Sequence, residues 1–174
     1  MLAAGQRACE TERVMSITLS VSLIHPKAQL PRFAHSPEEE AGMDLFATEE
    51  ILLAAGEWAS VGTGLVLEIP PGFEGQIRPR SGLALRHGVT LLNSPGTIDP
   101  GYRGELKILM INHGKQVFSI RPGDRIAQLV FTRIARPEFR IVTAFSDVGG
   151  RQKSGFGSTG IASACPNRAV RRNC

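Results

Sequence analysis

An aspartate and a tyrosine flank a Pro-Gly pair near the middle of the chain, within residues 93–104. Pro100 and Gly101 suit the second and third positions of a type II turn, because proline fixes φ and glycine accepts a positive φ. Such a turn would bring together the Asp99 carboxylate, a base for activating water, and the Tyr102 ring, a flat surface for a sugar or a nucleobase. Asp-Pro-Gly-Tyr is also an ordinary tight turn, so this segment alone leaves both interpretations open.

Three other segments carry side chains suited to phosphate or metal. Arg80 offers a charged fork and Ser81 a hydroxyl at the start of a predicted helix, where free backbone N–H groups also favour phosphate. Gln128 interrupts an apolar run, and a buried amide needs partners. Asp44 follows Gly42 and offers a carboxylate. The structural alternatives are an exposed turn with a helix cap at Arg80 and Ser81, a strand-edge hydrogen bond for Gln128, and a cap or turn at Asp44.

The glycine-rich segment 149–160 is predicted to be a mobile arm, because ordering so many glycines costs much backbone entropy. Residues 155–160 satisfy the dinucleotide spacing G-x-G-x-x-G, but no clear strand precedes them and too little chain follows for a Rossmann unit. A Walker A loop is also excluded, because Phe156 stands where that loop needs lysine. Flexible glycines with Arg151, Ser158 and Thr159 are nevertheless suited to closing over phosphates.

The elements that must position these residues are mostly short strands. The alternation of residues 16–23 is typical of a half-buried strand. Seven further strands are predicted between Gly, Pro, Asn or Asp, at residues 65–69, 75–78, 89–92, 105–111, 116–120, 126–132 and 139–143. Helical pattern is confined to residues 81–86, with Ser81 as the N-cap candidate and Gly88 as the stop signal. Many short strands predict a sandwich, barrel or jelly roll.

Composition narrows the class of protein. The 174 residues fit one domain, and no apolar run approaches the length of a membrane span. Three of the four net positive charges come from Arg168, Arg171 and Arg172 in the tail, so the body has no basic stripe for nucleic acid. The cysteines lie only in the tails, which argues against a disulfide framework or a zinc cluster. Charged residues interrupt the N-terminus where a signal peptide would be apolar, so we expect a cytoplasmic protein.

Five segments in fixed order together resemble the five-motif pattern of the dUTPase family. They are Ala41-Gly42-Met43-Asp44-Leu45, Pro79-Arg80-Ser81-Gly82-Leu83-Ala84, residues 93–104, Arg125-Ile126-Ala127-Gln128-Leu129 and residues 151–160. The resemblance covers about residues 17–160. It implies an all-β, jelly-roll-like barrel or sandwich with one short helix, and hydrolysis of dUTP to dUMP and pyrophosphate. This reaction lowers dUTP and supplies dUMP for dTMP synthesis.

The resemblance also implies a role for each matching residue. Asp99 would be the general base for the water that attacks the α-phosphorus, and Asp44 would reach Mg²⁺ through ordered water. Tyr102 would stack on deoxyribose and exclude a 2′-hydroxyl, while Asn93 would pair with uracil. Phe156 of the arm would cover the base. The full set of implied substrate-binding residues is Arg80, Ser81, Gly82, Asn93, Thr97, Ile98, Tyr102, Lys107, Gln128, Arg151, Phe156, Gly157, Ser158 and Thr159.

Family architecture further implies a homotrimer whose three sites are shared between subunits. The expected organisation is an N-terminal extension at 1–16, a β domain at 17–148, the arm at 149–160 and a basic tail at 161–174. The arm departs from the usual pattern, because Gln152-Lys153-Ser154 stands where the family often has glycines.

Two alternatives share the predicted fold. A dCTP deaminase needs a catalytic glutamate, and aligning Asn112-x-Gly114 with the deaminases places Leu109 at that position, where leucine cannot transfer a proton. A non-catalytic binding module would use the same polar loops for recognition only. The presence of Asp99 favours an enzyme over such a module.

Overall fold

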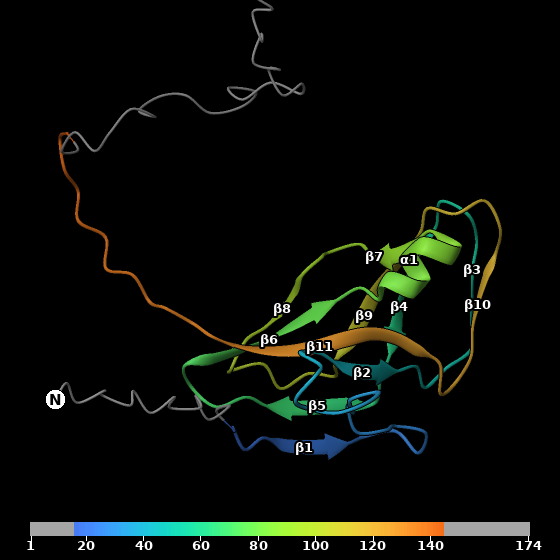
Figure 1. Ribbon diagram of the computed structural model, residues 1–174, viewed down its shortest axis with the longest axis horizontal. Helices are drawn as coiled ribbons and strands as arrows, with labels where there is room; N and C mark the ends of the chain where they lie inside the picture. Colours follow the sequence, from blue (N-terminus) through green and yellow to red (C-terminus); the bar gives the residue numbers. More distant parts are fainter. Residues whose placement is uncertain (1–15, 145–174) are drawn as a thin grey trace, which may run out of the picture. The chain divides into compact units, whose positions relative to one another are not determined.

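The computed structural model describes residues 16–144, which contain eleven strands and one helix (Figure 1). Contacts divide the chain into two units, Met1–Arg136 and Pro137–Cys174. Every described strand and the helix lie in the first unit. The predicted extension before residue 16, the glycine-rich arm and the basic tail lie outside the described residues. No helix in the described part of the chain is long and apolar enough to cross a membrane.

The strands pair antiparallel in four small sheets. Two are ribbons, in which β1 (Ser20–Leu23) pairs with β5 (Leu65–Glu68), and β3 (Ile51–Leu53) pairs with β10 (Phe118–Ile120). The three-stranded sheet has the order β4 (Trp58–Gly62), β9 (Lys107–Asn112) and β7 (Val89–Leu91). The four-stranded sheet has the order β2 (Met43–Phe46), β11 (Arg125–Arg133), β6 (Phe73–Arg78) and β8 (Gly96–Ile98). An all-β fold with one short helix is confirmed.

The core is built from the alternating faces of these strands. In β9, Ile108 and Met110 are at most 1% exposed, whereas the alternate residues Leu109 and Ile111 are only half-buried. Both therefore pack in the core of a single chain. Val117, directly before β10, is instead 61% exposed. Burying a side chain of this size contributes about 1.5–3 kcal/mol, so the regular period of β9 fixes which of its faces turns inward.

One predicted strand is wrong for the described part of the chain. Residues 139–143 form no strand, and Phe139 and Ile141 are 92% and 98% exposed. Alternation can indicate a strand, but a strand also needs a neighbour for its N–H and C=O groups. No described strand pairs with this segment. The first predicted strand is also shorter than its alternation indicates, because regular pairing begins only at Ser20.

The helix α1 (Ser81–His87) confirms the predicted helical segment but corrects its cap. The N-cap is Arg80, which makes no side-chain capping hydrogen bond, so Ser81 is the first helical residue rather than the cap. Gly88 ends the helix with φ 67°, and its N–H donates to the carbonyl oxygens of Ala84 and Leu83. A left-handed residue closes the helix here because glycine has no Cβ to oppose that conformation.

Replacing Gly88 with alanine should destabilise the protein in two ways. The left-handed backbone costs a non-glycine residue about 1–2 kcal/mol. A Cβ at this position would also lie 2.8 Å from the backbone nitrogen of Gly114. We expect the free energy of unfolding to fall by about 2–4 kcal/mol in all, measured by urea denaturation.

Gly56→Ala is a matched control for that prediction. Gly56 also has a positive φ, 82°, but a Cβ there would meet nothing within 4 Å. Gly56→Ala should therefore lower the free energy of unfolding only by the cost of the left-handed backbone, about 1–2 kcal/mol. Equal losses in the two variants would show that the contact between Gly88 and Gly114 carries no energy.

Candidate active site

Strand register assembles a polar pocket on the four-stranded sheet. In the ladders of β11, Gln128 stands opposite Asp44 of β2 on one side and Arg78 of β6 on the other. Pro79 follows β6, and Arg80 and Ser81 begin the helix directly above this row. Residues far apart in sequence are thus brought to one place. The pocket measures about 420 Å³ and is lined by Ala34, His35, Glu40, Gly42, Asp44, Arg80, Ser81, Gly82, Arg125 and Gln128.

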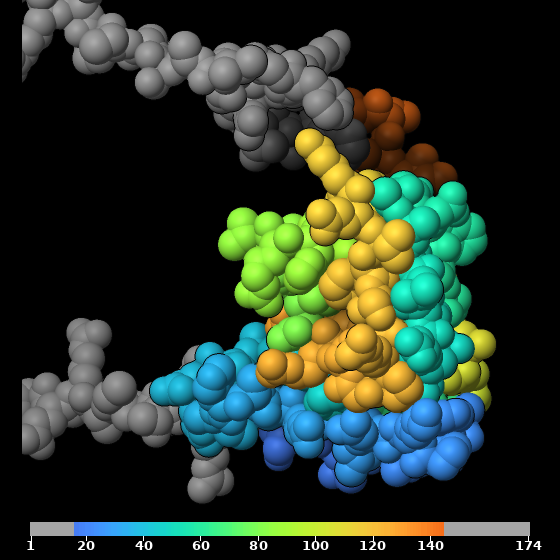
Figure 2. All heavy atoms as spheres, turned by 90° about the vertical axis from the view of Figure 1, so that its right-hand side faces the viewer, coloured from blue at the N-terminus to red at the C-terminus, as the bar shows by residue number. Residues whose placement is uncertain are grey.

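The surface is hollowed at this place. Figure 2 shows the recess between the light blue segment around residues 34–42 and the green segment around 81–87, with orange residues of β11 between them.

Asp44 pairs with two arginines in this polar pocket. It is only 6% exposed, so its charge must be compensated by neighbours. Its Oδ1 lies 3.0 Å from Nε of Arg80, and its Oδ2 lies 3.3 Å from Nη1 of Arg125. Nη1 of Arg80 also donates to the carbonyl oxygen of Arg125, at 3.1 Å. These bonds hold Arg80 in one orientation and leave its Nη2 without a partner among the described residues, available to an acceptor in the pocket.

The side-chain amide of Gln128 makes one structural hydrogen bond, and its Oε1 has no donor among the described residues. Its Nε2 donates to the carbonyl oxygen of Pro79 at 3.3 Å, which is the strand-edge bond that the sequence left open. A Cβ on Gly42 would lie 2.7 Å from Oε1 of Gln128, so a larger residue there would push against the amide. The glycine two residues before Asp44 therefore makes room for the side chain of Gln128.

His35 and Glu40 also line the polar pocket, and sequence reasoning missed both. Glu40 accepts hydrogen bonds from the backbone N–H of His35 at 2.9 Å and from its ring Nδ1 at 2.8 Å. The backbone hydrogen bond, followed by the ring, lowers the pKa of Glu40 from 4.5. No local pattern marks these residues, because they reach the pocket through a loop before β2.

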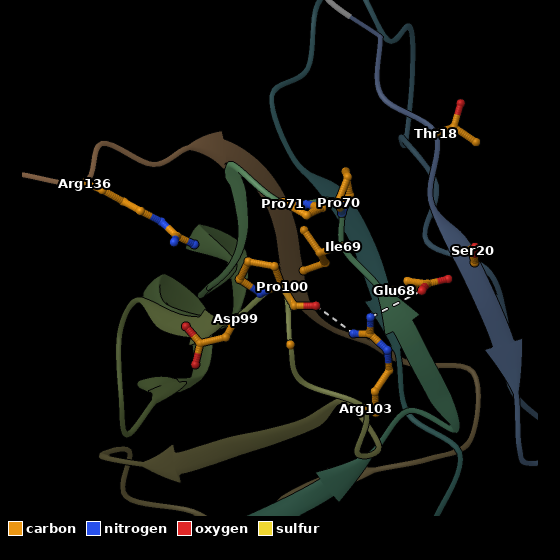
Figure 3. Close-up of a pocket in the computed structure, with 11 residues that line it drawn as sticks. Thr18, Ser20, Glu68, Ile69, Pro70, Pro71, Asp99, Pro100, Arg103 and Arg136 are labelled. Carbon is orange, nitrogen blue, oxygen red and sulfur yellow. Dashed lines mark hydrogen bonds and ion pairs between the residues drawn. The ribbon is translucent and has the colours of Figure 1, made fainter.

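Asp99 lies in a different pocket, of about 780 Å³, which Figure 3 shows with Glu68, Arg103 and Arg136 in its wall. Asp99 is exposed at the end of β8. The N–H of Tyr102 donates to its carbonyl oxygen at 3.1 Å, which confirms a tight turn. The predicted type II form is wrong, since Gly101 is not among the glycines with positive φ. Proline at the second position suits a type I turn equally well.

Arg103 braces this turn from the side. Its Nη1 donates to the carbonyl oxygens of Pro100 at 2.7 Å and Tyr102 at 2.8 Å. Its Nη2 lies 3.4 Å from Oε1 of Glu68 in β5, as the dashed line in Figure 3 marks. The side chains of Arg103 and Glu68 are 50% and 58% exposed, so this ion pair contributes little energy, and its effect is to orient the turn.

The other predicted substrate-binding residues near β8 and the Asp99 turn differ in how exposed they are. Tyr102 is 43% exposed, and Asn93 and Thr97 are exposed, whereas Ile98 is half-buried. Lys107 is exposed, with its Nζ 3.5 Å from Oε2 of Glu105. The predicted arm residues Arg151, Phe156, Gly157, Ser158 and Thr159 lie outside the described residues.

A single chain does not bring the two groups of residues together. In the ladder of β6 and β8, Gly75 stands opposite Ile98, which places Asp99 beyond it, at the level of Glu74. The polar pocket lies past the other end of β6, beyond Arg78. Four residue steps of about 3.3 Å separate these levels by about 13 Å. The candidate base and the candidate phosphate-binding residues therefore occupy separate pockets within one chain.

Comparisons with known proteins find similarity along most of the chain. The dUTPase family profile matches residues 28–160. A deoxyuridine 5′-triphosphate nucleotidohydrolase from Solibacter usitatus is 48% identical, covering 84% of this chain and 99% of its own. The enzyme of the same name from Clostridium kluyveri is 51% identical, covering 82% and 97%.

Solved structures give the same result. The dUTPase of Staphylococcus bacteriophage 80alpha with dUpNHpp is 30% identical, with a TM-score of 0.76, and covers 84% of this chain and 100% of its own. A mutant dUTPase from phage phi11 of S. aureus that coordinates a structural Mg(II) ion is 28% identical, with a TM-score of 0.68, covering 74% and 99%. The family profile and the close relatives show that the chain belongs to the dUTPase family.

Proposed function

We propose that this protein is a dUTP diphosphatase, which hydrolyses dUTP to dUMP and pyrophosphate by attack of water on the α-phosphorus. The polar pocket carries the proposal. It joins the Arg80 fork, the Ser81 hydroxyl and the Gln128 amide around the buried Asp44 in a member of this family. Such a set of donors suits a phosphate chain, and the Asp99 turn, in the other pocket, presents a carboxylate to solvent.

The polar pocket would hold the triphosphate. Asp44 fixes Arg80 through Nε, so the outer nitrogen of the guanidinium can donate to a phosphate oxygen without further ordering of the side chain. Ser81 makes no side-chain hydrogen bond to the described residues, and its exposed hydroxyl can donate to the same chain of phosphates. A preorganised set of donors stabilises charge as it develops on the leaving pyrophosphate.

Magnesium fits this site as an ion brought in by the substrate. Among residues 16–144 no group of three or more His, Cys, Asp or Glu side chains could hold a metal ion. Asp44 is a single carboxylate already paired with two arginines, so direct ligands would have to come from the phosphates, with Asp44 contacting the ion's water. When bound, Mg²⁺ would neutralise phosphate charge in the reaction.

Asp99 would take the proton from the attacking water. A carboxylate is a weak base, so most of the rate enhancement must come from positioning and electrostatics. Arg103 contributes by holding the turn that carries Asp99. Tyr102 would stack on the deoxyribose and Asn93 would pair with uracil. Gly82, Thr97, Ile98 and Lys107 would complete the site, with Arg151, Phe156, Gly157, Ser158 and Thr159 contributed by the arm.

A complete site would then require more than one copy of the chain. Neighbouring phosphorus atoms of a triphosphate lie only a few ångströms apart, whereas Asp99 and the polar pocket are separated by about 13 Å along β6. A second copy can supply Asp99 to the polar pocket of the first. The number of copies comes from the family resemblance, and we propose a homotrimer in which each site is shared between subunits.

Release of pyrophosphate from dUTP in the presence of Mg²⁺ tests the proposed function. We expect turnover that stops when the metal is chelated and returns when Mg²⁺ is added back. A protein that binds dUTP without turnover would instead be a nucleotide-binding module.

A further inference from the structure

The corner between β4 and β5 is fastened by side chains from three directions. The N–H of Gly62 donates to Oε1 of Glu49 at 2.8 Å. The N–H of Gly64 donates to Oε1 of Glu105 at 2.9 Å. The hydroxyl of Thr63, between them, donates to the carbonyl oxygen of Leu106 at 2.6 Å. Two carboxylates therefore hold the same corner in the same way, but only Glu105 belongs to the segment that follows the Asp99 turn.

Gly64, whose N–H donates to the Glu105 carboxylate, lies in tightly packed surroundings. Gly64 has φ 66°, and a Cβ there would lie 2.5 Å from the Cβ of His25 and 2.9 Å from that of Ala28. The backbone at this corner is thus closely surrounded. Leu106, which follows Glu105, is only 1% exposed, and its N–H donates to the carbonyl oxygen of Leu65 at 2.7 Å. The main chain at residues 105–106 is consequently fixed to β5.

Tyr102 is held by this same piece of main chain. Its hydroxyl donates to the carbonyl oxygen of Glu105 at 2.9 Å. The ring lies over Gly104, where a Cβ would be 2.5 Å from the tyrosine hydroxyl oxygen and 2.7 Å from Cζ. With 43% of the residue exposed, the ring is held in place yet open to a ligand. The orientation of the ring therefore depends on where the carbonyl group of Glu105 points.

We infer that Glu105 is a positioning residue for sugar selection. Its carboxylate, together with the bond from the N–H of Leu106 to Leu65, holds the carbonyl group that fixes the Tyr102 ring, and a fixed ring leaves no room for the 2′-hydroxyl of a ribonucleotide. This inference rests on the proposed function, because it concerns the choice between dUTP and UTP. The second carboxylate oxygen of Glu105, Oε2, lies 3.5 Å from Nζ of Lys107.

Glu105→Gln tests the inference, with Glu49→Gln as the matched control. An amide keeps the size of the side chain but replaces a charge-assisted hydrogen bond with a weaker neutral one. For Glu105→Gln we expect the ratio of kcat/KM for dUTP to kcat/KM for UTP to fall roughly threefold to tenfold. Glu49→Gln weakens the same kind of bond at the same corner and should leave the ratio as in wild type. Gly104→Ala, which displaces the ring directly, should also lower the ratio.

A second readout separates this inference from the proposed function. Tyr102 is the only tyrosine of the chain, so ¹³C-labelled tyrosine gives one NMR signal from its ring. This signal should move in Glu105→Gln and stay in place in Glu49→Gln, whether or not the protein hydrolyses any nucleotide. If both variants leave the signal and the ratio unchanged, Glu105 has no positioning role. Failure of wild type to hydrolyse dUTP would overturn the proposed function instead.

Discussion

Replacing Asp99 with asparagine should lower kcat for dUTP by roughly 10²- to 10⁴-fold, the contribution expected of a positioned general base. Asparagine keeps the shape of the turn, since the backbone bond from Tyr102 N–H to the carbonyl oxygen of residue 99 does not involve the side chain. Binding of dUTP should therefore stay within a few-fold of wild type. Steady-state kinetics gives kcat, and calorimetry with a non-hydrolysable dUTP analogue gives the affinity.

Asp124→Asn is the control for this substitution. Asp124 is an exposed aspartate whose Oδ2 accepts the backbone N–H of Arg121 in a turn outside both pockets. Asp124→Asn should leave kcat for dUTP unchanged. If Asp99→Asn instead keeps its kcat and loses affinity, Asp99 is a binding residue and another group must activate the water.

The second large effect is recovery of activity when two inactive variants are mixed. Arg80→Gln should be inactive because it removes a fixed cation from the polar pocket, and Asp99→Asn because it removes the base. If each site takes Arg80 from one subunit and Asp99 from another, random mixed trimers restore about one quarter of the sites. Unfolding the two variants together in urea, refolding them and measuring kcat per site tests this.

Each variant refolded alone is the control and should stay inactive. Activity of the mixture no higher than the sum of the two controls would place Arg80 and Asp99 of a single chain in one site. That result would contradict the separation of the two pockets along β6.

Sequence reasoning predicts some parts of this fold well because their determinants are local. The helix ends at Gly88 since glycine alone accepts that backbone at no cost, and β9 shows its buried face through a regular period. Strands of three or four residues, such as β2, β3 and β8, escape a period count because they are too short to show one. Residues 139–143 show the opposite failure, with a strand-like pattern and no pairing partner in the described chain.

In the candidate site, too, some residues could be predicted from the sequence and others depend on the fold. Residue types left Asp44, Arg80, Ser81 and Gln128 open between functional and structural roles, and the five-motif resemblance selected them. The ladders around β11 help to place them in one pocket. His35 and Glu40 were missed because only the folding of a loop brings them there. The tight turn at Asp99 was predictable, whereas its distance from the polar pocket depends on the register of β6 and β8. Register is set by pairing across the sheet and cannot be read from either strand alone.

The competing activity, deamination of dCTP, would need a proton-transfer group at the position that the sequence alignment gives to Leu109. Leu109 lies in the middle of β9, half-buried opposite Ser60 of β4. A leucine side chain neither donates nor accepts a proton, so this position cannot serve the deaminase chemistry.

The most direct test of the central claim is a comparison of pyrophosphate release from dUTP, UTP, dTTP and dCTP, side by side with Mg²⁺, with ammonia release measured on dCTP. The proposed function predicts rapid release from dUTP, far slower release from the other three and no ammonia. Equal rates with all four nucleotides, or turnover of dCTP alone, would contradict it.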